Sequence, residues 1–431
     1  MSTLSAGSFA ADPSSYIVRG MINLGFWKDI HEKAAAAGRP LYVLAPMADV
    51  TDCAFRKLIN KYGKPDVTWT EFVAADGIVR ATPEGKAKLM RDLIYNVRDV
   101  QEGDGSAPDA AGAYVSERPI VAQLFSSHPE YMEMAARLVA ELGYDGIDIN
   151  MGCPDKGIEK QGCGSAMIKT PKVAAAVIEA AKRGGVRKPS ATFNDDPELI
   201  ARFEAGDAAA LVHLPVTVKT RIGYSKDELE TWLPALLRAE PAAVTIHART
   251  RKEMSKVPAR WEDVKRAVQI RDEFFMQKKA RGEWNEGEDR TLILGNGDIT
   301  SIADAYEKGT AAGADGVMLG RAIFGNPWLF RNLDSKITHA ADEHHPLAYD
   351  PLAYLPSVSE KLRVMAEHTE EYERHLGDIK SFAIMKKHYK AYVHGFDGAK
   401  ELRAELMEHA QNAADVRRMA EDFLASQDMN M

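Results

Sequence analysis

Short apolar runs alternate with longer amphipathic stretches along the chain from about residue 41. The short runs are rich in β-branched residues and have the length of strands, whereas apolar positions in the longer stretches recur at the helical period. Such alternation is typical of βαβ units around a parallel sheet. We expect strands at 41–46, 67–72, 120–125, 146–150, 216–220, 243–247, 292–296 and 316–320.

Eight strands with helices between them predict a closed (β/α)8 TIM barrel, in which active-site groups lie at the carboxyl ends of the strands. An open doubly wound sheet is the alternative. The helix after the first strand has Asp49, Thr51 and Asp52 as candidate N-caps, followed by an apolar face. Further helices are expected at 130–142, 171–183, 226–239, 261–279 and 301–312.

The barrel pattern does not fill the whole chain. Three polar segments, 99–118, 186–214 and 281–290, interrupt it and are interpreted as surface insertions. The second contains FNDDPELIARFE, which can form a short helix of its own. By domain, we expect a flexible leader at 1–20, the catalytic barrel at 21–335, a Pro- and His-rich linker at 336–354 and an all-helical domain at 355–431.

The charge of the chain bears on its partner. With 55 Lys and Arg against 63 Asp and Glu, the formal charge is −8, so the chain is not a general nucleic-acid binder. The segment 374–403 is locally basic, with a net charge of +4, and Tyr389, Tyr392 and Phe396 are interleaved with this charge. Basic residues beside aromatic ones suit an RNA backbone. A solvated helix face with its aromatic rings in the core is the alternative.

The three cysteines are too few and too widely spaced for a disulfide framework or a zinc site. They favour a reducing, cytoplasmic environment. The first residues lack a basic signal-peptide region, and no run reaches the ~18 apolar residues that a membrane span needs. No HExxH motif or P-loop occurs. We therefore expect a soluble protein with no metal and no membrane partner.

Polar or conformationally special residues stand at the end of nearly every expected strand. In a barrel these ends converge on one ligand site, so their recurrence is a stronger signal than any single position. Gly-rich turns after the last two strands leave backbone N–H groups open to a phosphate; tight turns that merely need positive φ are the alternative. The strand-end residues are Pro46, Met47, Gln123, Asn150, Cys153, Lys219, Arg221, His247, Asn296, Gly297, Asp298, Gly320 and Arg321.

Some of these side chains indicate a chemistry. A thiol such as Cys153, with an ordinary pKa of about 8.5, stays largely protonated at neutral pH and can act as a general acid. The alternative is a small buried hydrophobe, the interpretation we prefer for Cys53 and Cys163. Lys219 would place a cation beside a flavin or a carbonyl group. His247 is as readily a core histidine as a ligand.

The segments APMADVTDCAFR, NMGCP, KQGCGSAM, VTVKTRIG, VTIHARTR, ILGNGDI and GVMLGRAIFGNPWLF resemble, in this order, the dihydrouridine synthase family. The resemblance covers most of residues 41–333, with a weaker echo in MKKHYKAYVHGFDGAKELRAELM. It implies a (β/α)8 barrel that holds FMN and a C-terminal helical domain that helps bind tRNA. The implied reaction is reduction of the C5=C6 bond of a uridine in folded RNA to dihydrouridine, with NADPH as the source of electrons.

By motif match, the resemblance also assigns roles to residues. Cys153 would protonate C5 as hydride reaches C6, and Asn150 and Arg221 would contact the uracil. The basic segment would contact RNA through Lys386, Lys387 and Lys390. The residues implied to hold FMN are Pro46, Met47, Gln123, Lys219, His247, Asn296, Gly297, Asp298, Gly320 and Arg321, with the last group around its phosphate.

Three departures from the family pattern leave the target open: the acidic total charge, the long insertions and the additional Cys163. The modified position, and whether the substrate is tRNA or rRNA, do not follow from the motifs. An FMN oxidoreductase acting on a free pyrimidine or dihydroorotate is the alternative among enzymes. A catalytically inactive RNA-binding barrel is an alternative from another class. We expect a monomer.

Overall fold

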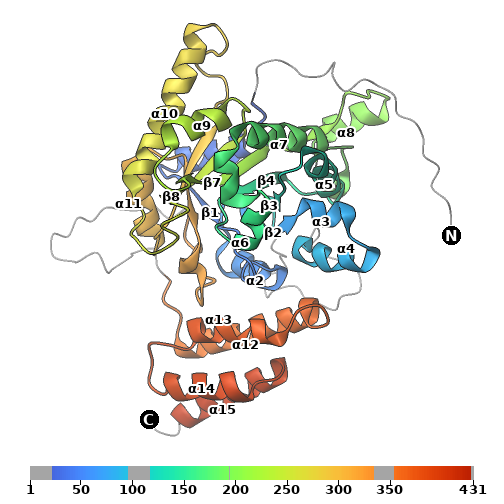
Figure 1. Ribbon diagram of the computed structural model, residues 1–431. Helices are drawn as coiled ribbons and strands as arrows, with labels where there is room; N and C mark the ends of the chain where they lie inside the picture. The colour runs from blue at the N-terminus through green and yellow to red at the C-terminus, as the bar shows by residue number, and fades with distance from the viewer. Residues whose placement is uncertain (1–21, 96–116, 194, 334–353, 429–431) are drawn as a thin grey trace.

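The computed structural model describes residues 22–95, 117–193, 195–333 and 354–428. The expected leader, residues 99–116 of the first insertion and residues 336–353 of the linker lie outside these ranges. Within them, the chain forms a barrel surrounded by helices, with a second group of helices attached to one side (Figure 1).

Eight parallel strands form one sheet, in the order β1-β10-β9-β8-β7-β4-β3-β2. A parallel bridge between Val43 of β1 and Val67, just before β2, closes the sheet into a barrel, so the open-sheet alternative is wrong. All eight expected strands are confirmed, although β7 and β8 run past their expected ends. The strands are β1 (Leu41–Leu44), β2 (Thr68–Ala74), β3 (Ile120–Phe125), β4 (Gly146–Met151), β7 (Val216–Gly223), β8 (Ala243–Thr250), β9 (Leu292–Asn296) and β10 (Gly316–Leu319).

Side-chain caps mark the start of some of the barrel helices. Of the three candidate caps after the first strand, Asp52 accepts a hydrogen bond from Phe55 N and starts α2. The helix expected at 226–239 is shorter at both ends than predicted, and the Asp227 side chain accepts the N–H of Leu229 at its first residue. The other expected helices are confirmed. The helices are α1 (Phe26–Ala36), α2 (Cys53–Gly63), α3 (Ala75–Arg80), α4 (Pro83–Met90), α5 (Pro129–Glu141), α6 (Lys156–Lys160), α7 (Pro171–Gly184), α9 (Leu229–Leu237), α10 (Trp261–Ala280) and α11 (Ile302–Ala312).

The insertion expected at 186–214 folds as a small unit of its own. Its strands β5 (Val186–Arg187) and β6 (Val212–His213) pair antiparallel. Between them lies α8 (Pro197–Glu204), which confirms the short helix expected in FNDDPELIARFE. Residues 281–290 consist of turns. The 3-10 turns of the barrel region are η2 (Arg91–Leu93), η3 (Gly164–Lys169), η4 (Ala191–Phe193) and η5 (Arg321–Ile323).

The described C-terminal residues form helices and no strand, as expected. α12 (Val358–Leu376) and α13 (Lys386–Tyr392) lie on the barrel side, and α14 (Ala399–His409) and α15 (Ala413–Asp428) lie beyond them (Figure 1). The 3-10 turn η6 (Phe382–Ile384) precedes α13.

One apolar cluster is shared between the barrel and the helical domain. Cys53, Ala54 and Leu58 of α2 are buried in the same cluster as Leu362 and Met365 of α12. The backbones of the two parts also touch. Gly325, at φ +66°, lies where a Cβ atom would be 2.1 Å from the carbonyl oxygen of Ala391. No helix within the described ranges is both long and apolar enough to cross a membrane.

Candidate active site

A pocket with a volume of about 230 Å³ opens at the carboxyl ends of the strands. Phe72 of β2 lines it but was missed in the sequence analysis, although an aromatic residue at the expected end of a strand was an available signal. Ala48, Gly152 and Pro154 complete the lining. The structure brings eight of the predicted residues together there: Pro46, Met47, Gln123, Asn150, Cys153, Lys219, Arg221 and His247.

The pocket concentrates buried positive charge. Burial and the neighbouring Arg221 lower the pKa of Lys219 to about 8. Burial lowers the pKa of Arg221 to about 10. Burial and the surrounding cations also hold the pKa of His247 well below its ordinary value, so its imidazole is neutral at pH 7. All three lowered pKa values mean that positive charge is unfavourable in this site. An anionic ligand would therefore stabilise the site.

Asn296, at the end of β9, orients Lys219 from below the pocket. Its Nδ2 atom donates a hydrogen bond of 2.8 Å to the carbonyl oxygen of Met318. A carbonyl oxygen can only accept, so the Oδ1 atom of Asn296 faces the other way. There it accepts a hydrogen bond of 3.1 Å from the Nζ atom of Lys219. Asn296 therefore acts on the pocket through Lys219.

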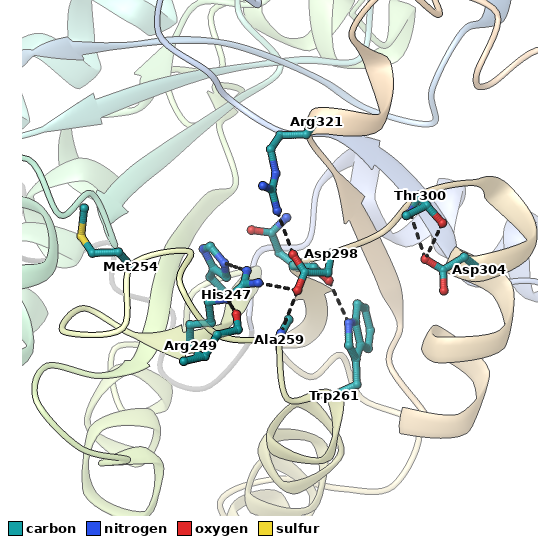
Figure 2. Close-up of polar contacts among 12 residues, drawn as sticks. His247, Arg249, Met254, Ala259, Trp261, Asp298, Thr300, Asp304 and Arg321 are labelled. Carbon is teal, nitrogen blue, oxygen red and sulfur yellow. Dashed lines mark hydrogen bonds and ion pairs between the residues drawn. The ribbon is translucent and has the colours of Figure 1, made fainter. Parts of the chain in front are cut away.

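The protonation of His247 follows from its neighbour Arg249. The Nε2 atom of His247 lies 3.1 Å from the Nη1 atom of Arg249, as Figure 2 shows. A guanidinium can only donate, so Nε2 of the neutral ring is the acceptor and Nδ1 carries the proton. His247 is thus a hydrogen-bond donor, through Nδ1, beside the pocket.

The turn after β9 binds arginines through the Asp298 carboxylate (Figure 2). This carboxylate accepts hydrogen bonds from Arg249, from Arg321 at 2.8 Å and from the backbone N–H of Ala259 at 2.9 Å. Arg249 is buried, whereas the Arg321 side chain is 67% exposed. A carboxylate would repel a phosphate, so Asp298 serves this turn as an orienting group for the two cations.

The backbone of the same turn requires glycine. Gly297 has φ +126°, and a Cβ atom there would lie 2.8 Å from the Cβ of Ala259. Its carbonyl oxygen accepts a hydrogen bond of 2.9 Å from the indole of Trp261. At Gly320, in the next turn, a Cβ atom would make only ordinary contacts, the nearest at 3.6 Å. The tight-turn interpretation therefore accounts for Gly297 but not for Gly320.

The loop that carries Cys153 is held at three points. Asn150 Oδ1 accepts hydrogen bonds from the backbone N–H groups of Gly152, at 3.1 Å, and Cys153, at 2.9 Å. The Nε atom of Arg221 donates to the carbonyl oxygen of Gly152 at 2.8 Å. The backbone N–H of Ser165 donates to the carbonyl oxygen of Cys153 at 2.9 Å. The thiol is therefore presented by a fixed backbone.

The glycines of KQGCGSAM explain part of this arrangement. Gly164 has φ +60°, and a Cβ atom there would lie 2.6 Å from the carbonyl oxygen of Cys153. A side chain at this position would push the loop away. The sequence of this segment does not reveal its contact with Cys153, because a contact between residues 153 and 164 depends on how the loop folds back.

The three thiols differ in accessibility. Cys53 and Cys163 are buried, and burial raises their pKa values to about 12 and about 11. Cys153 is partly exposed at the pocket, and burial raises its pKa as well, so the thiol form dominates at neutral pH. No group of three His, Cys, Asp or Glu side chains suited to a metal ion occurs in the part of the chain that the structure describes.

The basic segment is less uniform than its composition suggests. Tyr389 and Tyr392 are fully buried, which supports the core interpretation of these rings. Lys386 donates a hydrogen bond of 2.7 Å to the carbonyl oxygen of Met407, near the end of α14. Lys387 and Lys390 are exposed on α13. These two lysines are the exposed members of the predicted trio, and burial nevertheless lowers the pKa of Lys387.

Lys380 corrects the charge attributed to this segment. We counted it as part of a basic surface, but it is only 6% exposed. Its Nζ atom lies 2.7 Å from Glu71 of β2 and 2.9 Å from Asp92. Its charge is neutralised at the contact with the barrel, so the local excess of positive charge available to a ligand is smaller than +4.

Fold and site together define an enzyme of the (β/α)8-barrel class with a cationic pocket and a partly exposed thiol. The model of the family described as "Dihydrouridine synthase (Dus)" matches residues 43–192 and 191–428. The chain therefore belongs to the dihydrouridine synthase family.

Curated relatives extend along nearly the whole chain. The "Probable tRNA-dihydrouridine synthase" of Staphylococcus aureus (strain COL) is 32% identical over 404 residues, which cover 94% of this chain and 97% of that protein. The "Probable tRNA-dihydrouridine synthase 2" of Bacillus subtilis (strain 168) is 32% identical over 399 residues, covering 92% and 96%. Among solved structures, morphinone reductase in complex with tetrahydroNAD aligns at 12% identity and a TM-score of 0.37, covering 68% of this chain and 85% of that chain.

Proposed function

We propose that this protein uses FMN and NADPH to reduce the C5=C6 bond of uridines in tRNA, giving 5,6-dihydrouridine, with Cys153 as the proton donor to C5. Membership of the dihydrouridine synthase family supports the reaction class, and the names of the curated relatives support tRNA as the substrate. The observation that carries the proposal is the protonated, partly exposed Cys153 thiol in the cationic pocket.

The residues fit FMN by their chemistry. Burial, and after it the neighbouring cations, lower the pKa values of Lys219 and Arg221, so an anionic flavin and its phosphate would stabilise both charges. Pro46, Met47, Gln123, Lys219 and His247 would surround the ring system. Its phosphate would lie at the turns after β9 and β10, formed by Asn296, Gly297, Asp298, Gly320 and Arg321. The chemistry that FMN supplies when bound is hydride transfer from NADPH to C6 of the uridine.

Cys153 would complete the reduction by protonating C5 from the side of the base that faces the thiol. A hydride and a proton must reach adjacent carbons, so the acid must be held next to the base in a protonated form. Burial keeps the thiol protonated at neutral pH, and the hydrogen bonds to Asn150 and from Ser165 fix its backbone. Loss of the thiol proton to C5 leaves a thiolate, which Lys219 and Arg221 would stabilise.

Arg221 and Asn150 would contact the uracil with the donors that remain to them. Arg221 uses Nε and Nη1 for the carbonyl oxygens of Gly152, Thr250 and Met254. Its Nη2 atom forms no hydrogen bond with any residue in the described ranges and can donate to a uracil oxygen. Asn150 commits Oδ1 to the Cys153 loop and one hydrogen of Nδ2 to Gln123. Its second Nδ2 hydrogen is free for the base.

A uridine stacked in folded RNA must leave the stack to enter the pocket, which costs a few kcal/mol. Phosphate contacts from α13 would offset this cost, and Lys387 and Lys390 are the exposed cations there. The negative charges at Asp49 and Asp52 act on Lys387, so this part of α13 lies close to the loop that follows β1 at the pocket. Lys386 would contribute less, because its amino group already binds Met407.

A reconstituted reaction tests the proposal. The purified protein is loaded with FMN, reduced with NADPH without oxygen, and mixed with unmodified tRNA, unmodified rRNA fragments, uracil or orotate. We expect flavin reoxidation and dihydrouridine, detected by mass spectrometry, with tRNA only. Reaction with rRNA would move the target, and reaction with the free pyrimidine would favour the small-molecule alternative. A protein that binds no flavin would support the inactive barrel.

The Cys153→Ala variant tests the assigned acid in the same assay. We expect it to bind FMN and accept electrons from NADPH normally, but to reduce uridine at least about 100-fold more slowly. The Cys163→Ala variant is the matched control, since Cys163 is buried and does not line the pocket. Equal rates for Cys153→Ala and Cys163→Ala would move the proton donor to another group.

A further inference from the structure

Asp148 of β4 is a fully buried carboxylate that does not line the pocket. It lies two residues before Asn150 on the same strand, so both side chains point to the inside of the barrel. Asp148 accepts a hydrogen bond of 2.6 Å from the hydroxyl of Thr217 and one of 2.5 Å from Nε2 of Gln123. No part of the proposed reaction uses this group.

The hydrogen bonds run from Asp148 to the Cys153 loop in one direction. Because Gln123 donates to Asp148 through Nε2, its Oε1 atom faces Asn150 and accepts a hydrogen bond of 3.1 Å from Nδ2. Because Nδ2 of Asn150 is turned to Gln123, its Oδ1 atom faces the loop and accepts the N–H of Cys153 at 2.9 Å. The Asp148 carboxylate at one end and the Cys153 N–H at the other thus require the same orientation of both amides.

An ionised carboxylate can only accept, and this property sets the direction of the whole series. Burial raises the pKa of Asp148 to about 6, while the hydrogen bonds from Gln123 and Thr217 and the charge of Lys219 oppose the shift. Asp148 is therefore ionised at pH 8. With Gln123 reversed, Nδ2 of Asn150 would be turned toward the Cys153 N–H, and two donors would face each other.

We infer that Asp148 is a positioning residue for Cys153: its carboxylate fixes the orientation of the Gln123 and Asn150 amides, and through them the backbone that presents the thiol. The effect on uridine reduction rests on the proposed function. The effect on the loop does not, because it concerns hydrogen bonds within the protein. A role in packing alone would require only the volume of Asp148, and an asparagine would supply that equally well.

The Asp148→Asn variant separates these roles, because asparagine has nearly the same shape but can both donate and accept. At pH 8 we expect the variant to fold and to bind FMN with an unchanged visible spectrum. Its kcat for tRNA should fall about 10- to 100-fold with little change in KM, as is typical when an orienting partner is lost. Alkylation of Cys153 by iodoacetamide, measured without RNA on the protein with and without FMN, should quicken about fivefold in both states as the loop loosens.

Adding Gln123→Glu to Asp148→Asn provides a rescue. A glutamate at 123 accepts from both sides, so the Asn150 amide is again forced to turn Oδ1 toward Cys153. We expect the alkylation rate of the double variant to equal that of the unsubstituted protein. In the Gln123→Glu single variant the new carboxylate lies against Asp148 and repels it, so we do not expect the alkylation rate of the unsubstituted protein there. Thr217→Val is the matched control, since it removes the other donor to Asp148 but leaves the direction of the amides unchanged.

The outcomes separate the inference from the proposed function. Unchanged kcat and unchanged alkylation in a folded, flavin-loaded Asp148→Asn protein would overturn the positioning role, as would a double variant that fails to restore the alkylation rate. If alkylation follows the expected pattern but the unsubstituted protein makes no dihydrouridine, the proposed function fails and the positioning of Cys153 stands.

Discussion

The Nζ atom of Lys380 in the helical domain lies 2.7 Å from a carboxylate oxygen of Glu71 on β2, and both residues are buried. Asp92 adds a second carboxylate at 2.9 Å from the same amino group. Burial opposes the charge on Lys380, but the two carboxylates raise its pKa above the ordinary value. The helical domain and the barrel are thus joined by a buried charge cluster as well as by apolar packing.

Removing this lysine should destabilise the protein. Lys380→Met leaves two carboxylates without their cation, and we expect a loss of about 3 kcal/mol in the free energy of unfolding. Chemical denaturation measures the change. Lys390→Met, at an exposed position on α13, is the control and should change stability by less than about 0.5 kcal/mol. Adding Glu71→Gln to Lys380→Met should recover part of the loss, and no recovery would argue against the ion pair.

Alanine substitutions at Gly162 and Gly164 distinguish the effect of backbone strain from the effect of displacing the Cys153 thiol. Gly162 and Gly164 both have positive φ, so alanine at either should cost about 1 kcal/mol of stability. Only at Gly164 would the new Cβ atom collide with Cys153, whereas at Gly162 the nearest atoms are 3.5 Å away. We expect Gly164→Ala to abolish most uridine reduction and Gly162→Ala to retain it. Similar activities of the two variants would show that the close approach does not position the loop.

The pH profile of uridine reduction should report the raised pKa of Cys153. A proton donor is active only while protonated, and burial favours the protonated thiol in the folded protein. Loss of the thiol proton should therefore lower the rate only above the ordinary thiol pKa of about 8.5, separately from any earlier change as Lys219, whose pKa is about 8, loses its charge. The profile is measured with saturating tRNA in single-turnover reactions. A single fall centred below the ordinary thiol pKa, with no second fall above it, would contradict a raised thiol pKa.

Arg321 should matter for flavin binding and little for stability. Its side chain is 67% exposed and pairs only with Asp298 among the described residues, so Arg321→Ala should leave the unfolding midpoint almost unchanged. Loss of the proposed charge-assisted contact between Arg321 and the FMN phosphate should weaken FMN binding by about 10- to 100-fold. Flavin fluorescence titration measures this. Arg290→Ala, which breaks an exposed pair with Asp272, is the control, and equal affinities would place the phosphate elsewhere.

The exposed lysines of α13 should control RNA affinity. Reversing both charges, with Lys387→Glu and Lys390→Glu, should weaken tRNA binding about tenfold and lower the slope of log Kd against log salt by about 1 to 2. The flavin spectrum should not change. Lys279→Glu, at the end of α10 on the amino-terminal side of the barrel, is the control. An unchanged salt slope in the double variant would favour the alternative interpretation, in which the exposed side of α13 is a solvated helix face that does not contact RNA.

Most of the barrel and of the pocket lining could be predicted from the sequence, for a physical reason. Strand periodicity is local, and parallel strands in a barrel all end on one side, so strand-end residues such as Gln123, Lys219 and His247 had to converge. Contacts across long sequence separations could not be predicted. Glu71 and Lys380 are 309 residues apart, and composition alone made Lys380 look like part of a basic surface.

The direction of hydrogen bonds could also not be predicted from the sequence. The sequence shows Asp148 as one polar residue inside a buried strand, but its importance depends on which atom of Gln123 faces it. Likewise, the interleaved Tyr389 and Tyr392 left two interpretations open until their burial was known. Pairing, orientation and burial are properties of the packed chain rather than of local pattern.

The contact between Gly325 and Ala391 has a consequence for how a substrate is chosen. Two backbones that leave no room for a Cβ atom are in direct contact, so this contact helps to set the spacing between α13 and the barrel that carries Cys153. In an RNA bound as proposed, the distance between a backbone phosphate and the flipped-out base must match that spacing. Selection of a uridine would then depend on the shape of the folded RNA rather than on the identity of the neighbouring bases.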